Sequence, residues 1–419
     1  MPYAAELAPS PTDHPTVRQT GSVAHPSVAD HRIALRAVIG QAATETIALD
    51  RHAHRRRLAA PLLAVDDLPR FDNSAMDGYA AAPVSPDQLT FAVVGDVAAG
   101  DAARFRLEPG QAARVMTGAR LPVGTVGVVP VEQTDAARTG PAPQTVTFTT
   151  AVERDRHIRR RAEDIAAGMP VADAGDLLSP ALIALARSAG CIDAIVHVPT
   201  RVAVVATGAE LTVPGEDPGR GGIHESNSDM VAALATAAGC VPTHVETCTD
   251  DPDLLAALLD ELSAAPDVDL IITTGGVSAG AYEVVRQVCE PRESFSFVHL
   301  AMQPGGPQGL GRWGDTPVVC LPGTPVGAFV SFEMLVRPAL DARHGAPTRG
   351  ASSAAYVGRS RHTRAGKVQF LSAVLAGDGT VTVADGRQLC GLAQANALIE
   401  VPEGVDQLVA GDDVVVHPL

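Results

Sequence analysis

The chain has few aromatic residues, almost no lysine and no long apolar segment. Only 3% of its 419 residues are aromatic, which predicts cores built from aliphatic side chains. Lys367 is the single lysine, so arginine supplies nearly all of the positive charge. No apolar run reaches the length of a membrane span, and the first thirty residues lack the basic and apolar regions of a secretory signal. We therefore expect a cytoplasmic protein that does not insert into membranes, with residues 1–30 as a disordered tail.

Paired cysteines and a basic surface are also missing. The six cysteines are scattered, without a C-x-x-C pair or a Cys/His spacing typical of zinc, which indicates buried thiols in a reducing compartment. The formal net charge is −16, so the surface repels nucleic acid and anionic membranes. These features exclude nucleic acid as a partner.

The first half of the chain predicts two units. Apolar residues recur at helical spacing in 31–39, in 46–58 and in 180–189. We assign 31–66 together with 151–198 to a helical linking domain. Between them, 67–150 carries short β-type runs separated by Gly, Pro and Asp, which favours a projecting β-rich lobe.

The second half predicts an α/β domain followed by a β domain. Strands that read as fully buried, at 201–206, 268–274 and 317–321, alternate with helical segments, which is typical of a parallel sheet covered on both faces. We assign 199–341 to a three-layer α/β domain. Residues 342–419 return to short strands and turns, and we assign them to a small barrel-like β domain.

Each of the three buried strands ends in a loop that carries glycine. In open α/β sheets ligands bind at the carboxyl ends of the strands, and small residues there let backbone N–H groups approach an oxyanion. A plain strand-to-helix turn explains any one loop, but three matching loops favour a phosphate-binding pocket. The loop residues are Thr207, Gly208, Gly275, Gly276, Ser278, Pro322, Gly323 and Thr324.

Carboxylates occur in or beside these turn-like segments. Oxygen ligands of this kind hold Mg²⁺ against a phosphate, although a solvated surface acid is the alternative for each one. Helix capping is a further alternative for the adjacent pair before Pro252. The carboxylates are Asp77, Asp164, Glu210, Asp250, Asp251 and Glu283.

The segment 68–80 fits neither a helix face nor a half-buried strand. Its sequence, LPRFDNSAMDGYA, crowds polar side chains between Phe71 and Tyr79. On chemistry alone it is either a tight turn or part of a site, because Asn, Ser, Asp and Gly are the residues that turns use.

Six ordered motifs together resemble the signatures of the MoeA family of molybdopterin molybdenumtransferases, to which the E domain of gephyrin is related. The likeness covers nearly the whole chain from residue 31. The motifs are PRFDNSAMDGYA at 69–80, RVMTGA at 114–119, EDI at 163–165, TGAEL at 207–211, GGVS at 275–278 and LPG at 321–323.

The resemblance implies a transferase that inserts molybdate into adenylylated molybdopterin, with Mg²⁺ and release of AMP. It also implies an elongated homodimer whose active cleft lies between protomers. The implied catalytic residues are Asp77, Glu210 and Glu283. The implied metal ligands are Asp77, Glu210, Asp250 and Asp251. The implied substrate-binding residues are the eight loop residues named above together with Asn73, Ser74, Thr117, Gly118 and Asp164.

Several positions depart from the family pattern. Where relatives read KPGKP, this chain has QPGGP at 303–307, so two lysines expected to meet phosphate or molybdate are absent. Each such contact contributes about 1.5–3 kcal/mol. Further departures are Ala209, Ala281, Glu283, Thr324 and Cys390. The alternative function is therefore a catalytically impaired, gephyrin-like dimeric scaffold whose C-terminal domain binds a peptide of a partner protein.

Overall fold

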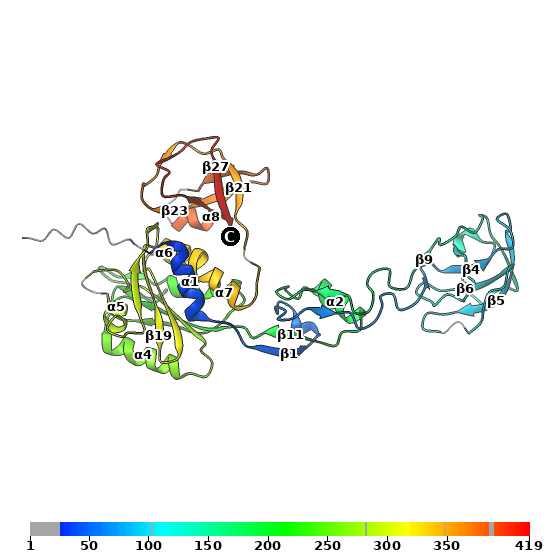
Figure 1. Ribbon diagram of the computed structural model, residues 1–419, viewed down its shortest axis with the longest axis horizontal. Helices are drawn as coiled ribbons and strands as arrows, with labels where there is room; N and C mark the ends of the chain where they lie inside the picture. The colour runs from blue at the N-terminus through cyan, green and yellow to red at the C-terminus, as the bar shows by residue number, and fades with distance from the viewer. Residues whose placement is uncertain (1–25, 102–103, 281–282, 348, 385–388) are drawn as a thin grey trace, which may run out of the picture.

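The computed structural model describes residues 26–101, 104–280, 283–347, 349–384 and 389–419. The molecule is elongated, with an α/β domain and a C-terminal β domain at one end, a narrow linking unit in the middle and a β lobe at the other end (Figure 1). Within these ranges, none of the helices combines the length and the hydropathy that a membrane crossing requires. Most of the expected tail lies outside the described residues, and helix α1 (Val28–Ile39) already begins inside it.

The α/β domain is built on one six-stranded sheet. Its first four strands are parallel and its last two are antiparallel to their neighbours. The three strands expected from the sequence lie side by side at its centre. In spatial order the strands are β15 (Val241–Cys248), β12 (Arg201–Thr207), β16 (Leu270–Thr274), β20 (Thr316–Leu321), β19 (Pro307–Trp313) and β17 (Ser296–His299).

Helices cover both faces of this sheet, which confirms the three-layer prediction. Successive strand side chains point to opposite faces, so Val202 and Val204 join one apolar core while Ala203 and Val205 join the other. One core is covered by α1, α3 (Asn227–Ala237) and a continuous helix made of α6 (Pro325–Ser331), a π-helical turn (Phe332–Val336) and α7 (Arg337–Arg343). The other core is covered by α4 (Pro252–Ala264) and α5 (Val284–Cys289).

The linking unit is mostly extended rather than helical. Strand β1 (Thr44–Ala48) pairs with β11 (Asp193–His197), and β2 (Leu62–Leu63) pairs with β10 (Pro170–Ala172). The expected helix at 180–189 is α2 (Pro180–Ser188). The expected helix at 46–58 was wrong, because that segment holds part of β1 and a single 3₁₀ turn, η1 (Arg51–Ala53). Its β-branched residues favour a strand once a distant partner strand is available.

The distal lobe is a five-stranded sheet that confirms the β-rich prediction. Its strands, in spatial order, are β7 (Gly127–Pro130), β4 (Gly78–Ala82), β6 (Gln111–Val115), β5 (Thr90–Val97) and β8 (Thr145–Thr147). The short 3₁₀ turn η2 (Val131–Gln133) directly follows β7 in the chain. Several of the few aromatic residues meet in its core, where the Phe91 and Phe148 rings stack with centroids 4.8 Å apart. Strand β3 (Asn73–Ser74) pairs with β9 (Ile158–Arg159) at the base of the lobe.

The C-terminal domain is a closed five-stranded barrel, as the sequence predicted. The strands follow one another around the barrel, and the pairing of the last with the first closes it. The order is β23 (Val368–Leu375), β24 (Thr380–Val383), β21 (Ser352–Tyr356), β27 (Asp413–Pro418) and β25 (Ala397–Val401). Strand β18 (Met302–Gln303) pairs with β23 and joins the barrel to the α/β domain. Smaller elements are β13 (Leu211–Thr212) with β14 (Ile223–His224), β22 (Arg361–His362) with β26 (Gln407–Leu408), and α8 (Leu389–Gln394).

Candidate functional site

A cavity of about 610 Å³ opens where β12, β16 and β20 end. The three loops expected from the sequence meet around it; Glu210 and Glu283 belong to two of them, and Asp250 comes from the loop after β15. The lining residues that the sequence singled out are Thr207, Gly208, Glu210, Asp250, Gly275, Gly276, Ser278, Glu283, Pro322, Gly323 and Thr324. The topology thus collects residues from positions 207 to 324 at one edge of the sheet.

Glycine lets these loops touch one another. Gly275 has φ +97°, and a Cβ built on it would lie 2.4 Å from the Thr207 carbonyl oxygen. A Cβ on Gly323 would lie 3.2 Å from the Gly275 Cα. Since other residues would push the loops apart, the close approach of three strand ends depends on these glycines.

A buried amide that the sequence reasoning missed ties two of the loops together. The Asn227 side-chain nitrogen donates to the Thr274 hydroxyl at 3.0 Å and to the Gly323 carbonyl at 2.7 Å. The Thr274 hydroxyl in turn donates to the Pro322 carbonyl at 2.9 Å. Asn227 lines the cavity and begins α3, where the buried Glu225 carboxylate accepts the backbone N–H groups of Asn227 and Ser228. The polar run Glu-Ser-Asn-Ser is typical of a capped helix start, so it is the sequence feature that could have indicated this position.

Two carboxylates hold the loops while keeping oxygens for other partners. Glu283 accepts the Ser278 backbone N–H at 2.9 Å, and Asp250 accepts the Ala209 N–H at 3.0 Å. In each case a single carboxylate oxygen is used. Glu210 folds over Gly208, where a Cβ would lie 2.8 Å from a Glu210 carboxylate oxygen. The cavity wall therefore presents hard oxygen donors beside backbone loops.

Asp251 has a different position from its neighbour. Its carboxylate caps α4 by accepting the Asp253 and Leu254 N–H groups at 2.9 and 3.2 Å, and it does not line the cavity. Asp251→Ala should lower the free energy of unfolding by about 1 kcal/mol, because the first turn loses its cap. Urea denaturation measures the loss, and Asp251→Ser, which keeps a capping oxygen, is the matched control. Equal stabilities for the alanine and serine variants would contradict the capping role.

The 68–80 motif folds into a second polar unit, on the distal lobe. Asp77 accepts the backbone N–H of Thr117 at 2.7 Å and the Thr117 hydroxyl at 2.8 Å. These bonds favour the ionised carboxylate and hold the pKa of Asp77 below its ordinary value. Gly118, at φ +80°, donates its N–H to the carbonyl of the buried Ser74. The bonds of Asp77 and Ser74 to Thr117 and Gly118 thus join the motif and the 114–119 segment into one structure. Within the motif, the Asn73 amide donates to the Phe71 carbonyl at 3.2 Å.

A single chain does not bring the two units together. The lobe and the α/β cavity lie at opposite ends of the molecule (Figure 1). Asp164 is exposed near the base of the lobe, where its N–H donates to the Leu68 carbonyl at 3.0 Å. Across the described part of the chain, no three His, Cys, Asp or Glu side chains are grouped so as to hold a metal ion. Ala281, one of the departures from the family pattern, lies outside the described residues.

The loop that lacks the family lysines lies between two cavities. Gly305 and Pro307 line the candidate cavity, whereas Gln303 lines a neighbouring cavity of about 360 Å³ that borders the barrel. The side-chain oxygen of Gln303 is buried and accepts no hydrogen bond from any described residue. A Cβ on Gly306 would lie 2.7 Å from the ring of the exposed His299, so a side chain at 306 requires that ring to move.

Comparisons with known proteins cover nearly all of the described chain. Residues 26–190 match the MoeA N-terminal region (domain I and II), 203–342 a probable molybdopterin binding domain and 354–419 the MoeA C-terminal region (domain IV). Molybdopterin molybdenumtransferase 2 of Mycobacterium tuberculosis is 41% identical over 86% of this chain and 92% of its own. The Haemophilus influenzae molybdopterin molybdenumtransferase is 32% identical over 68% and 70%. The MoeA structure from Pyrococcus horikoshii OT3 superposes with a TM-score of 0.77 at 25% identity, over 94% of this chain and 99% of its own.

Proposed function

The chain belongs to the MoeA family of molybdopterin molybdenumtransferases, and from this membership we infer that it is a transferase of molybdenum cofactor biosynthesis. Molybdopterin and molybdate follow as its substrates. Relatives from different bacteria are named as transferases, so the scaffold alternative is not favoured.

The observation that carries the proposal is the meeting of three glycine-bearing loops around one cavity. We propose that this cavity, within the α/β domain at 199–341, binds adenylylated molybdopterin through backbone N–H groups of the loops. Catalysis is then mainly positioning and charge stabilisation: a molybdate oxygen attacks the phosphoryl group, the phosphoanhydride bond breaks so that AMP leaves, and the metal enters the dithiolene. The buried Asn227 bridge supports this role, because it keeps two loops in place before a ligand arrives.

The cavity offers carboxylate oxygens of the kind that magnesium binds together with substrate phosphates. Asp250 and Glu283 each give one carboxylate oxygen to a loop N–H and keep the other, and Glu210 lies on the same wall. The three carboxylates do not form a complete metal site by themselves, so we propose that one or two of them would bind Mg²⁺ together with the substrate phosphates, whose charge the ion would offset. We leave Asp251 out of the site, since its carboxylate caps α4.

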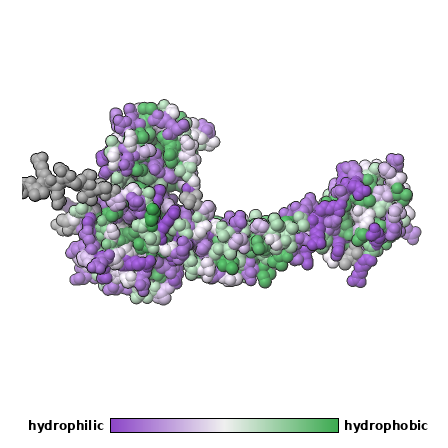
Figure 2. All heavy atoms as spheres, viewed as in Figure 1, coloured by the Kyte–Doolittle hydropathy of each residue, from purple (hydrophilic) through white to green (hydrophobic). Residues whose placement is uncertain are grey.

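We also propose a cytoplasmic homodimer in which the polar unit around Asp77 and Thr117 (the Asp77 unit) of one protomer faces the cavity of its partner. The distance between the two units within one chain supports this arrangement (Figure 1). So does the exposed apolar surface of the linking unit (Figure 2), which carries Leu63, Val65, Met169, Leu177, Ile192 and Ile195. Light scattering at micromolar concentration should give twice the chain mass of 43.1 kDa. A mass of one chain would contradict the dimer.

AMP release tests the proposed reaction directly. The purified protein should release AMP from adenylylated molybdopterin when molybdate and Mg²⁺ are present, and much less when molybdate is omitted. Binding of the substrate without molybdate-dependent AMP release would refute the transferase activity.

The missing lysines lead to a second prediction for the reaction. Gln303→Lys should raise turnover at low substrate, because an added cation favours an anionic ligand and the Gln303 oxygen has no hydrogen bond to lose. Turnover at substrate concentrations below KM is the measurement. Gln287→Lys, which adds the same charge at an exposed position on α5, is the control. Equal turnover in both variants would show that a charge at position 303 does not interact with the ligand.

A further inference from the structure

A second cavity, of about 410 Å³, lies at the base of the distal lobe and is rich in arginine. Its volume is in the range of small-molecule sites. Its charged lining residues are Arg70, Asp72, Arg120, Arg160 and Arg161. Figure 2 shows hydrophilic side chains gathered where the linking unit enters the lobe, next to β9. Four guanidinium groups around one cavity contrast with the formal charge of −16 for the whole chain.

The arginines divide into two that are held and two that are available. Arg160 pairs with Asp72 and Asp155, and Arg161 pairs with Asp67. These two arginines therefore connect segments that form the cavity wall. Arg70 and Asp66 are 3.5 Å apart and both exposed, which makes a weak surface pair.

Arg120 lies over Phe71, with its Cζ 5.6 Å from the ring centroid, and forms no ion pair with any described residue. It is exposed. Arg70 and Arg120 are therefore available to bind an anion, because neither would lose a buried contact.

The cavity adjoins the Asp77 unit in both sequence and structure. Arg120 is three residues beyond Thr117, and the backbone of Asn73 forms a bridge with that of Arg120. Asp72, on the cavity wall, precedes β3, which leads directly toward Asp77. A ligand at Asp77 thus lies beside the arginine cavity on the same lobe.

We propose that the arginine cavity binds a phosphate group, with Arg70 and Arg120 as its principal contacts. The planar guanidinium fork matches two phosphate oxygens, and its charge is permanent. The identity of the ligand rests on the proposed function: the phosphate belongs to the anionic substrate or to the AMP that leaves. The lobe then supplies cationic contacts that the 303–307 loop of this chain lacks.

Calorimetric titration with pyrophosphate tests the site without any turnover. Arg70→Gln combined with Arg120→Gln should raise the Kd of one class of pyrophosphate site about tenfold or more, because two charge-assisted contacts are lost. Arg104→Gln combined with Arg138→Gln is the matched control. Both control residues are exposed arginines of the same lobe outside the cavity, and Arg138 has a similar 3.5 Å pair with Glu132. The control should keep the affinity of the parent.

Three results would overturn the site: no pyrophosphate binding by the parent, unchanged affinity in the Arg70/Arg120 variant, or an equal loss in the control. AMP release separates this inference from the proposed function. If the parent releases AMP but the cavity variant keeps full pyrophosphate affinity, the inference fails and the transferase stands. If AMP release is absent while pyrophosphate binding depends on Arg70 and Arg120, the transferase fails and the site stands.

Discussion

Asp77→Asn is expected to abolish molybdate-dependent AMP release while leaving the fold intact. An asparagine oxygen accepts the same two hydrogen bonds from Thr117, at nearly the same volume, so only the negative charge is removed. Loss of one preorganised electrostatic contact typically lowers kcat by about 100- to 1,000-fold. We expect a loss of at least this size if Asp77 faces the cavity of the partner.

The control for this variant is a second charge removal on the same lobe. Asp87 is exposed in a turn, and Asp87→Asn should keep the AMP release of the parent. Circular dichroism and the thermal midpoint of both variants should match the parent, because Asp77 contributes little to packing. Full turnover in Asp77→Asn would remove this carboxylate from the mechanism.

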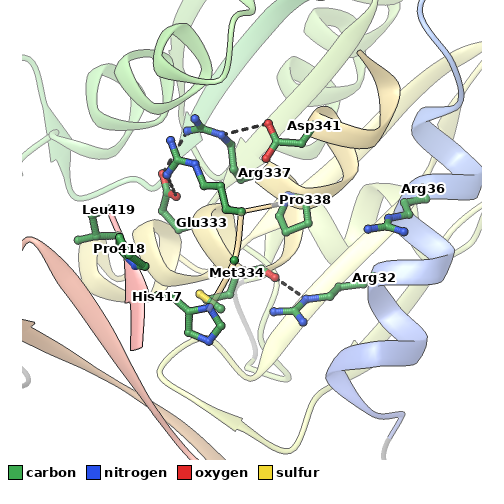
Figure 3. A pocket seen from close by; sticks show the side chains of 12 residues that line it. Arg32, Arg36, Glu333, Met334, Arg337, Pro338, Asp341, His417, Pro418 and Leu419 are labelled. Atoms are coloured by element: carbon green, nitrogen blue, oxygen red, sulfur yellow. Dashed lines mark hydrogen bonds and ion pairs between the residues drawn. The ribbon is translucent and has the colours of Figure 1, made fainter. Parts of the chain in front are cut away.

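The second large effect concerns a buried charge cluster between the α/β domain and the barrel (Figure 3). Arg337 is 6% exposed and lies between two carboxylates of its own helix, 3.6 Å from Glu333 and 3.5 Å from Asp341. It also donates to the Ala237 carbonyl at 2.9 Å. Nearby, Arg32 of α1 donates to the Met334 carbonyl of the π-helical turn at 2.6 Å. Arg337 is thus the principal positive partner of two acids that water barely reaches.

Arg337→Met should lower the free energy of unfolding by about 3–5 kcal/mol, because it leaves two buried carboxylates without that partner. The measurement is denaturant unfolding at neutral pH. Arg349→Met is a matched control, since Arg349 also lies 3.6 Å from Glu333 but is 45% exposed. Its loss should cost less than about 1 kcal/mol. Equal losses for both variants would show that burial does not set the contribution of the pair.

The stability of the Arg337→Met variant should recover as the pH falls. Burial raises the pKa of Glu333 above its ordinary 4.5, and the charge of Arg337 opposes that rise. Without Arg337 the folded-state pKa rises further, so the folded chain binds a proton that the unfolded chain does not. Stability then increases as the pH is lowered from neutrality through that pKa. A difference from the parent that stays constant from pH 7 to 5 would contradict this explanation.

Local patterns were sufficient to predict the architecture of the α/β domain. The strands at 201–206, 268–274 and 317–321 could be predicted because each contains a run of apolar residues and leads into a glycine-bearing loop. Parallel strands end at one edge of a sheet, so the meeting of their loops follows from the chain order. The helix predicted at 46–58 was wrong for the opposite reason. Its strand is stabilised by β11, about 145 residues further along the chain, and a local pattern does not contain that partner.

The sequence by itself determined the family, the order of the domains and the loops that line the cavity, since these depend on motifs and on short-range periodicity. Only the tertiary structure decided what each carboxylate does. Asp250 reaches the Ala209 loop while its neighbour Asp251 caps a helix, and Asn227 joins two loops from a third segment. It also decided that the lobe that carries Asp77 and the α/β domain that carries Glu210 lie at opposite ends of one chain (Figure 1). Side-chain direction and the separation of domains depend on contacts between residues far apart in sequence, and no local pattern records them.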